Sequence, residues 1–349
     1  MKVLFLYSEY VNYLDGVMRQ LASTYGASVH VVSWDEQLLK PANRPSIKGV
    51  TFQDRSGLST TALTSLIERF DPEILYVSGW MDKGYLSAIS RARNRSAFTT
   101  VCGFDDNWQG TARQRLGSIY FRLYLRRFFD RAWVSGARQY NFARNLGYQD
   151  EEIAFNLLSC DSEKFNRNHG HERRLIERKK AFFYVGNFRE VKGIDILISA
   201  YKHYCTALGG NWDLICIGQG PLANRLKEEP RITVLDYMDS SSLIAKSAMY
   251  DVFVFPSLKD QWGVALHEFA SLGFPLLSSV GAGSADQFLI DGYNGLTFSR
   301  GDVGSLANAM LEFQLMPDEK LREFGLRSRI LGATITSEIS AASLMSLAH

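Results

Sequence analysis

Apolar and polar positions alternate along this chain with two different periods. Short apolar runs at 2–7, 28–33, 74–78, 97–102 and 132–135 predict strands. The segments between them, near 14–24, 60–70, 81–93, 112–129 and 137–146, predict helices. Strands that alternate with helices favour a parallel sheet covered on both faces. The first half is therefore predicted to be a doubly wound α/β domain.

A polar, charged stretch at 161–180 interrupts this pattern, which restarts with the apolar run 181–185. The 349 residues exceed the ~250–300 at which a single core stops growing. We therefore expect domains at 1–168 and 169–334, followed by an amphipathic helix at 335–349. His169 and His171 lie in the polar stretch without a third ligand nearby, so we interpret them as solvated linker residues rather than metal ligands.

The clearest candidate site lies between residues 251 and 284. A buried strand at 251–255 ends at Pro256, and a helix is predicted from Gly263 to a stop at Gly273. The N-terminus of a helix suits a phosphate, because its first N–H groups have no partner in the helix and its dipole is positive there. Glu268 lies on the helical face of Val264, one turn further on, where a carboxylate can accept hydrogen bonds from ribose hydroxyls. Asp260, before the helix, can hold hydroxyls on the other side.

The stretch from Asp260 to Glu268 resembles the acidic-x7-acidic motif of retaining GT-B glycosyltransferases, in particular family 4, the glycosyl transferases group 1. That family has Pro-Ser, Glu, seven residues, Glu-Ala and then Gly-x-Pro. This chain has Pro256-Ser257, Asp260, seven residues, Glu268-Phe269-Ala270 and Gly273-Phe274-Pro275. Aspartate replaces the first glutamate and is one methylene shorter.

The resemblance implies a GT-B fold: α/β, with two Rossmann-like doubly wound parallel-sheet domains facing a central cleft. It implies an N-terminal acceptor-binding domain, a C-terminal nucleotide-sugar-binding domain and a final helix that packs back on the first domain. It further implies a hexosyl-type transfer with retained anomeric configuration, without a metal and without a cofactor. The donor would be a UDP-sugar or a GDP-sugar, and the acceptor a glycan or a lipid-linked molecule.

The resemblance also assigns residues in the second half. Lys192-Gly193 ends a loop whose Arg and Lys hold the donor diphosphate in the family; Asn187 stands at the family's arginine position, and Arg189 is the expected substitute. The predicted donor-binding residues are Gly186, Asn187, Gly218, Tyr237, Met238, Gly263, Val264, Ala265 and Glu268. The predicted catalytic residues are Lys192, Arg189, Asp260, Asp105 and Asp106.

Three positions in the first half are candidates as well. Gly16 is the single glycine where the family carries a glycine-rich loop near the acceptor. Asp105 and Asp106 occupy a turn in which the family places a histidine or an aspartate facing the reaction centre. The alternative for the two aspartates is an N-cap of the helix that follows Thr111.

Charge is uneven along the chain. The whole chain carries +2, whereas residues 91–131 hold nine arginines and three acids, a net of +6, interleaved with aromatic residues. One interpretation is a core-facing aromatic stripe on a basic helix; the other is a face that meets anionic lipid head groups or a lipid-diphosphate acceptor. Nucleic acid is not expected, because the whole chain is only weakly basic and has no nucleic-acid-binding motif.

No run of eighteen apolar residues is present, so no membrane-spanning helix is expected. The predicted location is the cytoplasm, with peripheral attachment to the inner face of the membrane as the second interpretation of the basic region. The predicted role is bacterial polysaccharide or glycolipid synthesis. Two other functions stay open: a nucleotide-sugar epimerase of the same fold, and a non-catalytic nucleotide-sugar-binding partner.

Overall fold

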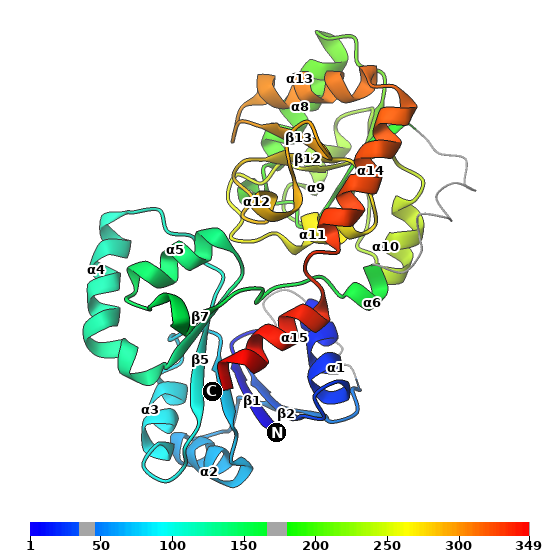
Figure 1. Cartoon of the computed structure of the whole chain (residues 1–349). Coiled ribbons are helices and arrows are strands. Elements are labelled where there is room, and N and C mark those ends of the chain that lie inside the picture. The colour runs from blue at the N-terminus through cyan, green and yellow to red at the C-terminus, as the bar shows by residue number, and fades with distance from the viewer. Residues whose placement is uncertain (35–45, 166–179, 349) are drawn as a thin grey trace. The chain divides into compact units, whose positions relative to one another are not determined.

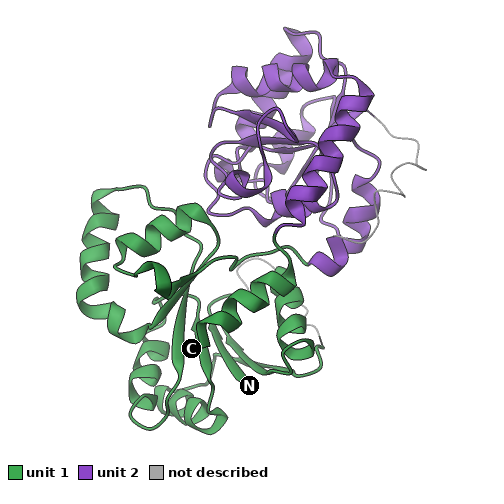
Figure 2. Ribbon diagram, in the orientation of Figure 1, with its two compact units in different colours: residues 1–161, 335–349 green, residues 162–334 purple. Residues whose placement is uncertain are grey.

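A computed structural model describes residues 1–34, 46–165 and 180–348 of the chain. They form two compact units (Figure 2): unit 1 contains residues 1–161 and 335–349, and unit 2 contains residues 162–334. The domain boundary expected at 168/169 lies outside the described residues, as do His169 and His171.

Unit 1 is a seven-stranded parallel sheet with strand order β3-β2-β1-β4-β5-β6-β7 (Figure 1). Its strands are β1 (Lys2–Tyr7), β2 (Ser28–Ser33), β3 (Val50–Asp54), β4 (Ile74–Val77), β5 (Thr99–Phe104), β6 (Arg131–Val134) and β7 (Ile153–Ala154). Its helices are α1 (Asp15–Ser23), α2 (Thr60–Phe70), α3 (Lys83–Ala92), α4 (Ala112–Tyr120), α5 (Ala137–Asn145) and α15 (Ser337–Met345). Short helical turns are η1 (Asn12–Leu14), η2 (Phe121–Leu125), η3 (Arg126–Phe128), η4 (Asp150–Glu152) and η6 (Ser346–Ala348).

Unit 2 repeats the plan with a six-stranded parallel sheet of order β10-β9-β8-β11-β12-β13. Its strands are β8 (Ala181–Val185), β9 (Asp213–Ile217), β10 (Ile232–Leu235), β11 (Val252–Phe255), β12 (Leu276–Ser279) and β13 (Gly295–Phe298). Its helical segments are α6 (Ser162–Phe165), η5 (Glu190–Lys192), α8 (Ile194–Thr206), α9 (Ala223–Lys227), α10 (Ser240–Ser247), α11 (Val264–Ser271), α12 (Ala285–Phe288), α13 (Val303–Leu315) and α14 (Asp318–Gly332).

Both sheets are doubly wound, as predicted from the alternation of strands and helices. In each, the strand order reverses beside the first strand, between β1 and β4 in unit 1 and between β8 and β11 in unit 2. The strands of unit 2 are buried on both faces, since Phe182, Phe183, Val252 and Phe253 are inaccessible to solvent. Because the strands of each sheet are parallel, the residues that follow them lie together at its carboxyl edge. Open α/β sheets bind ligands at this edge.

The C-terminal segment belongs to unit 1, where α15 packs on α1. The hydroxyl of Ser337 donates to the carbonyl of Cys160 at 3.2 Å, and the amide of Asn156 donates to the hydroxyl of Ser343 at 3.4 Å. By length and composition, one helical stretch in the described residues, Asp318–Ala348, is apolar enough to cross a membrane. It is divided at residues 333–336 into α14 and α15, which pack in different units, so we interpret it as two helices of two separate cores.

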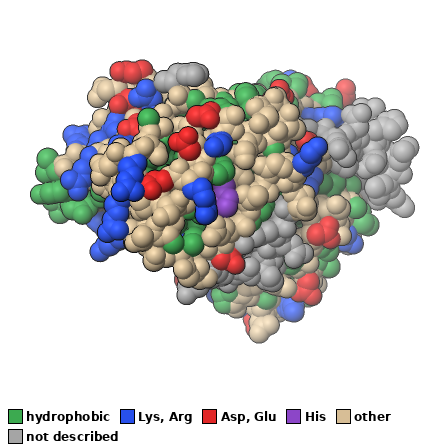
Figure 3. All heavy atoms as spheres, turned by 90° about the horizontal axis from the view of Figure 1, so that it is seen from below, with side chains coloured by type: hydrophobic (Ala, Val, Ile, Leu, Met, Phe, Trp, Pro, Cys, Tyr) green, Lys and Arg blue, Asp and Glu red, His purple; other side chains and the backbone are tan. Residues whose placement is uncertain are grey.

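The predicted helical stretch at 112–129 is helical from Ala112 to Phe128, but its second half is not α-helical. Helix α4 ends at Tyr120 and continues as the π-helical turn η2 and the 3₁₀ turn η3. The outer face of this region is apolar and basic: in Figure 3, apolar side chains gather beside Lys and Arg side chains at the left edge, over α4. Strand β3 and helix α14 were not predicted. β3 is the partly exposed edge strand of its sheet and lacks a continuous apolar run.

Candidate functional site

The candidate site of unit 2 lies at the carboxyl edge of its sheet, where β8 and β11 diverge. The loop after β8 and the loop after β11 contact each other through their backbones: the N–H of Leu258 donates to the carbonyl of Val191 at 3.0 Å. Gly193 has a φ of 72°, and a Cβ there would overlap the carbonyl oxygen of Pro256. A glycine is therefore required at this position for the two loops to meet.

An ion pair joins these two loops. Lys192 Nζ lies 2.5 Å from Asp260 Oδ2, and the Ser257 hydroxyl donates to the same oxygen at 3.3 Å. The Asp260 side chain is 9% exposed and that of Lys192 is 30% exposed. The backbone of Asp260 is fixed as well, because its carbonyl accepts from the N–H of Gly283 at 3.1 Å. The carboxylate is thus rigidly placed, and it orients an ammonium group that remains partly open to solvent.

The N-terminus of α11 lies directly after this aspartate. Gly263, its N-cap residue, has a φ of 91°, and no side chain caps the helix. A Cβ at Gly263 would lie 2.8 Å from the Phe255 ring, and the hydroxyl of Ser284 donates to the Gly263 carbonyl at 3.0 Å. The first N–H groups of α11, which begin at the half-buried Val264 and Ala265, are therefore not used by a side-chain cap and suit an anion. Glu268 is half-buried one turn further along the helix.

The glycines in the loops after β8 and β9 have packing roles, and two of them, Gly186 and Gly218, are predicted donor-binding residues. A Cβ at Gly218 (φ 146°) would overlap the carbonyl oxygen of Gly186, and one at Gly220 would lie 2.6 Å from the backbone of Phe188. The N–H of Phe188 in turn donates to the carbonyl of Gln219 at 2.8 Å. These glycines let the two loops pack closely, with the exposed Asn187 and Arg189 flanking the buried Phe188. Both side chains are thus exposed at the carboxyl edge of the sheet.

Tyr237 and Met238 follow β10 and precede α10, whose N-cap is Asp239. Because β10 is parallel to β9, this segment lies at the same carboxyl edge as the loops after β8 and β9. Tyr237 is exposed and Met238 is half-buried. The fold thus brings every predicted residue of the second half to one edge of one sheet.

The three candidates of unit 1 are distributed differently. Gly16 is buried in α1, where an added Cβ would overlap the hydroxyl of Ser337 in α15. The packing of α1 on α15 thus requires a residue without a side chain at this position. Asp105 and Asp106 are exposed directly after β5. The alternative that they cap the next helix is wrong, because the N-cap of α4 is Thr111, whose hydroxyl accepts from the N–H of Gln114.

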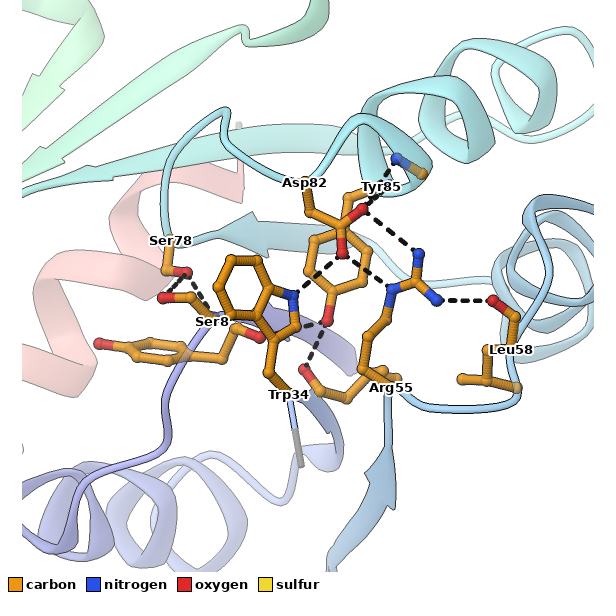
Figure 4. A network of polar contacts seen from close by, with 10 residues as sticks. Ser8, Trp34, Arg55, Leu58, Ser78, Asp82 and Tyr85 are labelled. Atoms are coloured by element: carbon orange, nitrogen blue, oxygen red, sulfur yellow. Dashed lines mark hydrogen bonds and ion pairs between the residues drawn. The ribbon is translucent and has the colours of Figure 1, made fainter. Parts of the chain in front are cut away.

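A polar network at the carboxyl edge of unit 1 was not predicted (Figure 4). Its centre is Asp82, the N-cap of α3, which accepts hydrogen bonds from Trp34 Nε1 at 3.0 Å and Arg55 Nε at 2.8 Å. Beside it, the N–H of Ser8 donates to the hydroxyl of Ser78 at 2.8 Å, across the divergence of β1 and β4. The sequence offered one indication of this network, which is the position of its residues: each closely follows a predicted or observed strand.

The electrostatics of Asp82 follow from these contacts. Partial burial alone would raise the pKa of its carboxyl, but hydrogen bonds from Arg55 and Trp34 and from backbone N–H groups outweigh burial and lower the pKa. Asp82 is therefore a fixed anion that holds the ends of β2 and β3 against α3. The exposed ring of Trp34 is held in one orientation by its bond to this carboxylate.

Comparison with known proteins decides the family. The family model described as "Glycosyl transferases group 1" matches residues 166–329. This range contains the glycine-lined loops, the Lys192–Asp260 pair and α11. The second unit belongs to the glycosyl transferases group 1.

Similar curated proteins agree with this family. The chain is 26% identical over 188 residues to N-acetyl-alpha-D-glucosaminyl L-malate synthase of Bacillus anthracis, covering 52% of this chain and 46% of that protein. It is also 26% identical over 179 residues to the capsular polysaccharide biosynthesis glycosyltransferase CapM of Staphylococcus aureus, covering 49% and 45%. The chain thus matches about half the length of these curated relatives.

Solved structures extend the likeness to the whole fold. Sucrose-phosphate synthase of Thermosynechococcus elongatus superposes with a TM-score of 0.76 at 16% identity, over 99% of this chain and 98% of that one. Anabaena HepE in complex with UDP and glucose has a TM-score of 0.70 at 15% identity, over the same shares. At such identities the likeness concerns the fold alone. Together with the two parallel sheets, it confirms the predicted GT-B class for this chain.

Proposed function

We propose that this group 1 chain transfers a sugar from a UDP-sugar to an acceptor hydroxyl with retention of the anomeric configuration. The Lys192–Asp260 ion pair carries this proposal, because it lies where the strand order of unit 2 reverses, beside the α11 N-terminus that no side chain caps. Such an edge suits a ligand with two phosphates and several hydroxyls. The complex of HepE with UDP and glucose supports uridine over guanosine.

The proposed division of roles follows from charge and position. Lys192, Arg189 and the first N–H groups of α11 stabilise the charge that develops on the departing diphosphate. Asp260 holds the Lys192 ammonium and accepts hydrogen bonds from donor sugar hydroxyls. Glu268, one helical turn beyond the phosphate-binding N-terminus, accepts hydrogen bonds from the ribose. These groups supply the positive charge of the site as side chains and a helix dipole, so the proposed reaction proceeds without a metal.

The acceptor side is assigned to unit 1, with Asp105 and Asp106 aligning an acceptor hydroxyl. Both are exposed after β5, at the edge that also holds the Asp82 network. The similarity to CapM supports a role in bacterial polysaccharide or glycolipid synthesis on the cytoplasmic side of the membrane.

The test is an assay of purified protein with a panel of UDP-sugars and GDP-sugars, measuring free nucleoside diphosphate and the sugar product by NMR. Release of UDP from one UDP-sugar, at a rate that Lys192→Met lowers about a hundredfold, is expected. Lys320→Met is the matched control, since Lys320 pairs with Glu323 on the surface of α14 at 2.9 Å. An epimerised sugar without free diphosphate would replace the proposal by an epimerase, and binding without turnover would make the chain a non-catalytic partner.

A further inference from the structure

The helix α4 and the turn η2 present an apolar stripe to solvent. Its members are spaced three, one, three and one residues apart, which places them on one side of the helix. We call this set the α4 stripe: Leu116, Ile119, Tyr120, Leu123 and Tyr124, exposed by 70, 54, 55, 69 and 56%. Monomeric proteins rarely expose such contiguous apolar surface without a use for it.

The opposite side of the same segment is fixed in the core of unit 1, so the stripe does not turn inward. Phe121 is fully buried and stacks on Phe129 at 6.1 Å between ring centroids, with an interplanar angle of 3°. It also meets Trp80 at 5.0 Å. Leu125 is buried one turn later. The aromatic residues of the basic region therefore divide: the phenylalanines at 121 and 129 belong to the core, whereas Tyr120 and Tyr124 face solvent.

Arginines surround the stripe, and acids are missing from it. No Asp or Glu occurs between residues 107 and 129 of the sequence. The exposed arginines of this stretch are Arg113, Arg115, Arg122 and Arg127. Arg126 has a structural role instead, because it pairs with Glu152 at 2.6 Å and lies 4.1 Å from the Tyr148 ring centroid. The surface thus combines exposed apolar side chains with exposed arginines. Figure 3 shows apolar and basic side chains next to one another at its left edge.

We infer that the α4 stripe and its arginines dock unit 1 on an anionic lipid bilayer. A bilayer offers an apolar layer for the leucines and tyrosines and, directly above it, acidic head groups for the guanidinium groups. Tyrosine suits this boundary because its ring is apolar and its hydroxyl is polar. A second copy of the chain is a poorer occupant, since like charges would face each other across the interface. The inference needs no nucleotide-sugar and stands apart from the proposed transfer activity.

The two parts of the surface predict different responses. Each arginine near an anionic surface contributes about fivefold to the affinity, and the attraction fades over a Debye length of ~8 Å at physiological salt. The apolar side chains contribute by burial, which salt does not screen. Binding is therefore expected to need anionic lipid, to fall with added salt and to fall further when the stripe itself is made polar.

The first experiment measures sedimentation of the full chain with vesicles of phosphatidylcholine alone and of phosphatidylcholine with phosphatidylglycerol at 7:3. Binding is expected only to the anionic vesicles. The variant Arg113→Gln, Arg115→Gln, Arg127→Gln is expected to bind about a hundredfold more weakly. The control Lys48→Gln, Lys83→Gln, Lys227→Gln removes the same charge from exposed positions on other elements and is expected to bind like the unaltered protein. Arg122 is kept, because it donates to the Asn145 carbonyl at 2.8 Å.

A second pair of variants tests the stripe. Leu116→Gln with Leu123→Gln is expected to lower binding at least tenfold without changing the melting temperature, since both side chains are exposed. Its control, Leu326→Gln with Ile330→Gln, alters two exposed apolar residues of α14 in unit 2 and is expected to leave binding unchanged. Equal affinity for neutral and anionic vesicles, or equal loss in test and control variants, would overturn the inference. So would concentration-dependent dimers in sedimentation velocity that the stripe variant abolishes, since the stripe would then be a contact between copies.

Discussion

Replacing Lys192 by methionine tests the candidate site most directly. The change removes the ammonium 2.5 Å from Asp260 Oδ2 and keeps a long apolar side chain. Asp260 is only 9% exposed and would lose its charged partner, and breaking a fully buried pair costs about 3–5 kcal/mol. Lys192 itself is 30% exposed, so water partly compensates, and we expect a loss of about 2–3 kcal/mol. For a unit the size of residues 162–334 this corresponds to a melting temperature lower by about 5–10 °C.

The assay is a double-mutant cycle with Asp260→Asn, followed by thermal unfolding and by donor hydrolysis in parallel. Removing both charges leaves no unpaired buried ion, so the double variant is expected to regain at least half of the lost stability. Its hydrolysis rate is expected to stay about a hundredfold low, because the positive charge on the leaving diphosphate is still missing. Lys320→Met is the control, since it breaks an exposed pair with Glu323 and should cost less than about 1 kcal/mol.

Two results would refute this reasoning. If the double variant recovers both stability and turnover, Lys192 only neutralises Asp260 and does not act on the donor. If Lys192→Met leaves the melting temperature unchanged, the ion pair does not form as described.

Three further predictions address other parts of the molecule. Glu268→Gln is expected to weaken donor binding by about 1.5–3 kcal/mol in calorimetry with nearly unchanged melting temperature, and unchanged affinity would remove it from the site. Gly16→Ala is expected to destabilise unit 1 by about 1–3 kcal/mol in denaturant unfolding, because its Cβ would overlap the Ser337 hydroxyl, and the companion change Ser337→Gly should restore part of the loss. The pKa of Asp82 is lowered in the folded state, so its stabilising effect is complete above the unfolded value near 4 and is lost as pH falls through the lower folded value. The stability difference between the unaltered protein and Asp82→Asn, measured from pH 6 to pH 2.5, should therefore shrink toward acid pH, and a constant difference would contradict the role given to Arg55.

Local patterns in the sequence were sufficient for most of the elements and for the kind of fold, although they missed β3 and α14. Burial on both faces makes parallel strands continuous apolar runs, so 181–185 and 251–255 could be identified without any tertiary information. Two glycines with positive φ were marked in the sequence as well, Gly193 at the end of a loop and Gly263 at the start of a helix. The strand, turn and helix around Asp260 and Glu268 carried the family resemblance for the same reason: the site is built from short segments whose shape depends on neighbouring residues.

Contacts between distant segments needed the tertiary structure. Lys192 and Asp260 are 68 positions apart and meet only because β8 and β11 lie side by side in the sheet. Gly16 and Ser337 are further apart still, and their contact gives a packing reason for the glycine that was predicted to bind the acceptor. The Asp82 network depends in the same way on the order of the strands that its residues follow.

The tertiary structure also decided which side of α4 is buried in the core. Apolar and aromatic residues recur through this part of the sequence on more than one side of a helix. The sequence therefore agreed both with a stripe that faces the core and with a stripe that faces solvent. The π-helical turn at 121–125 and the stacking of Phe121 on Phe129 select one side for the core and leave Leu116, Leu123 and the tyrosines outside. Hydrophobic periodicity is a local property of the chain, whereas the side that is buried depends on which neighbour the fold places against it.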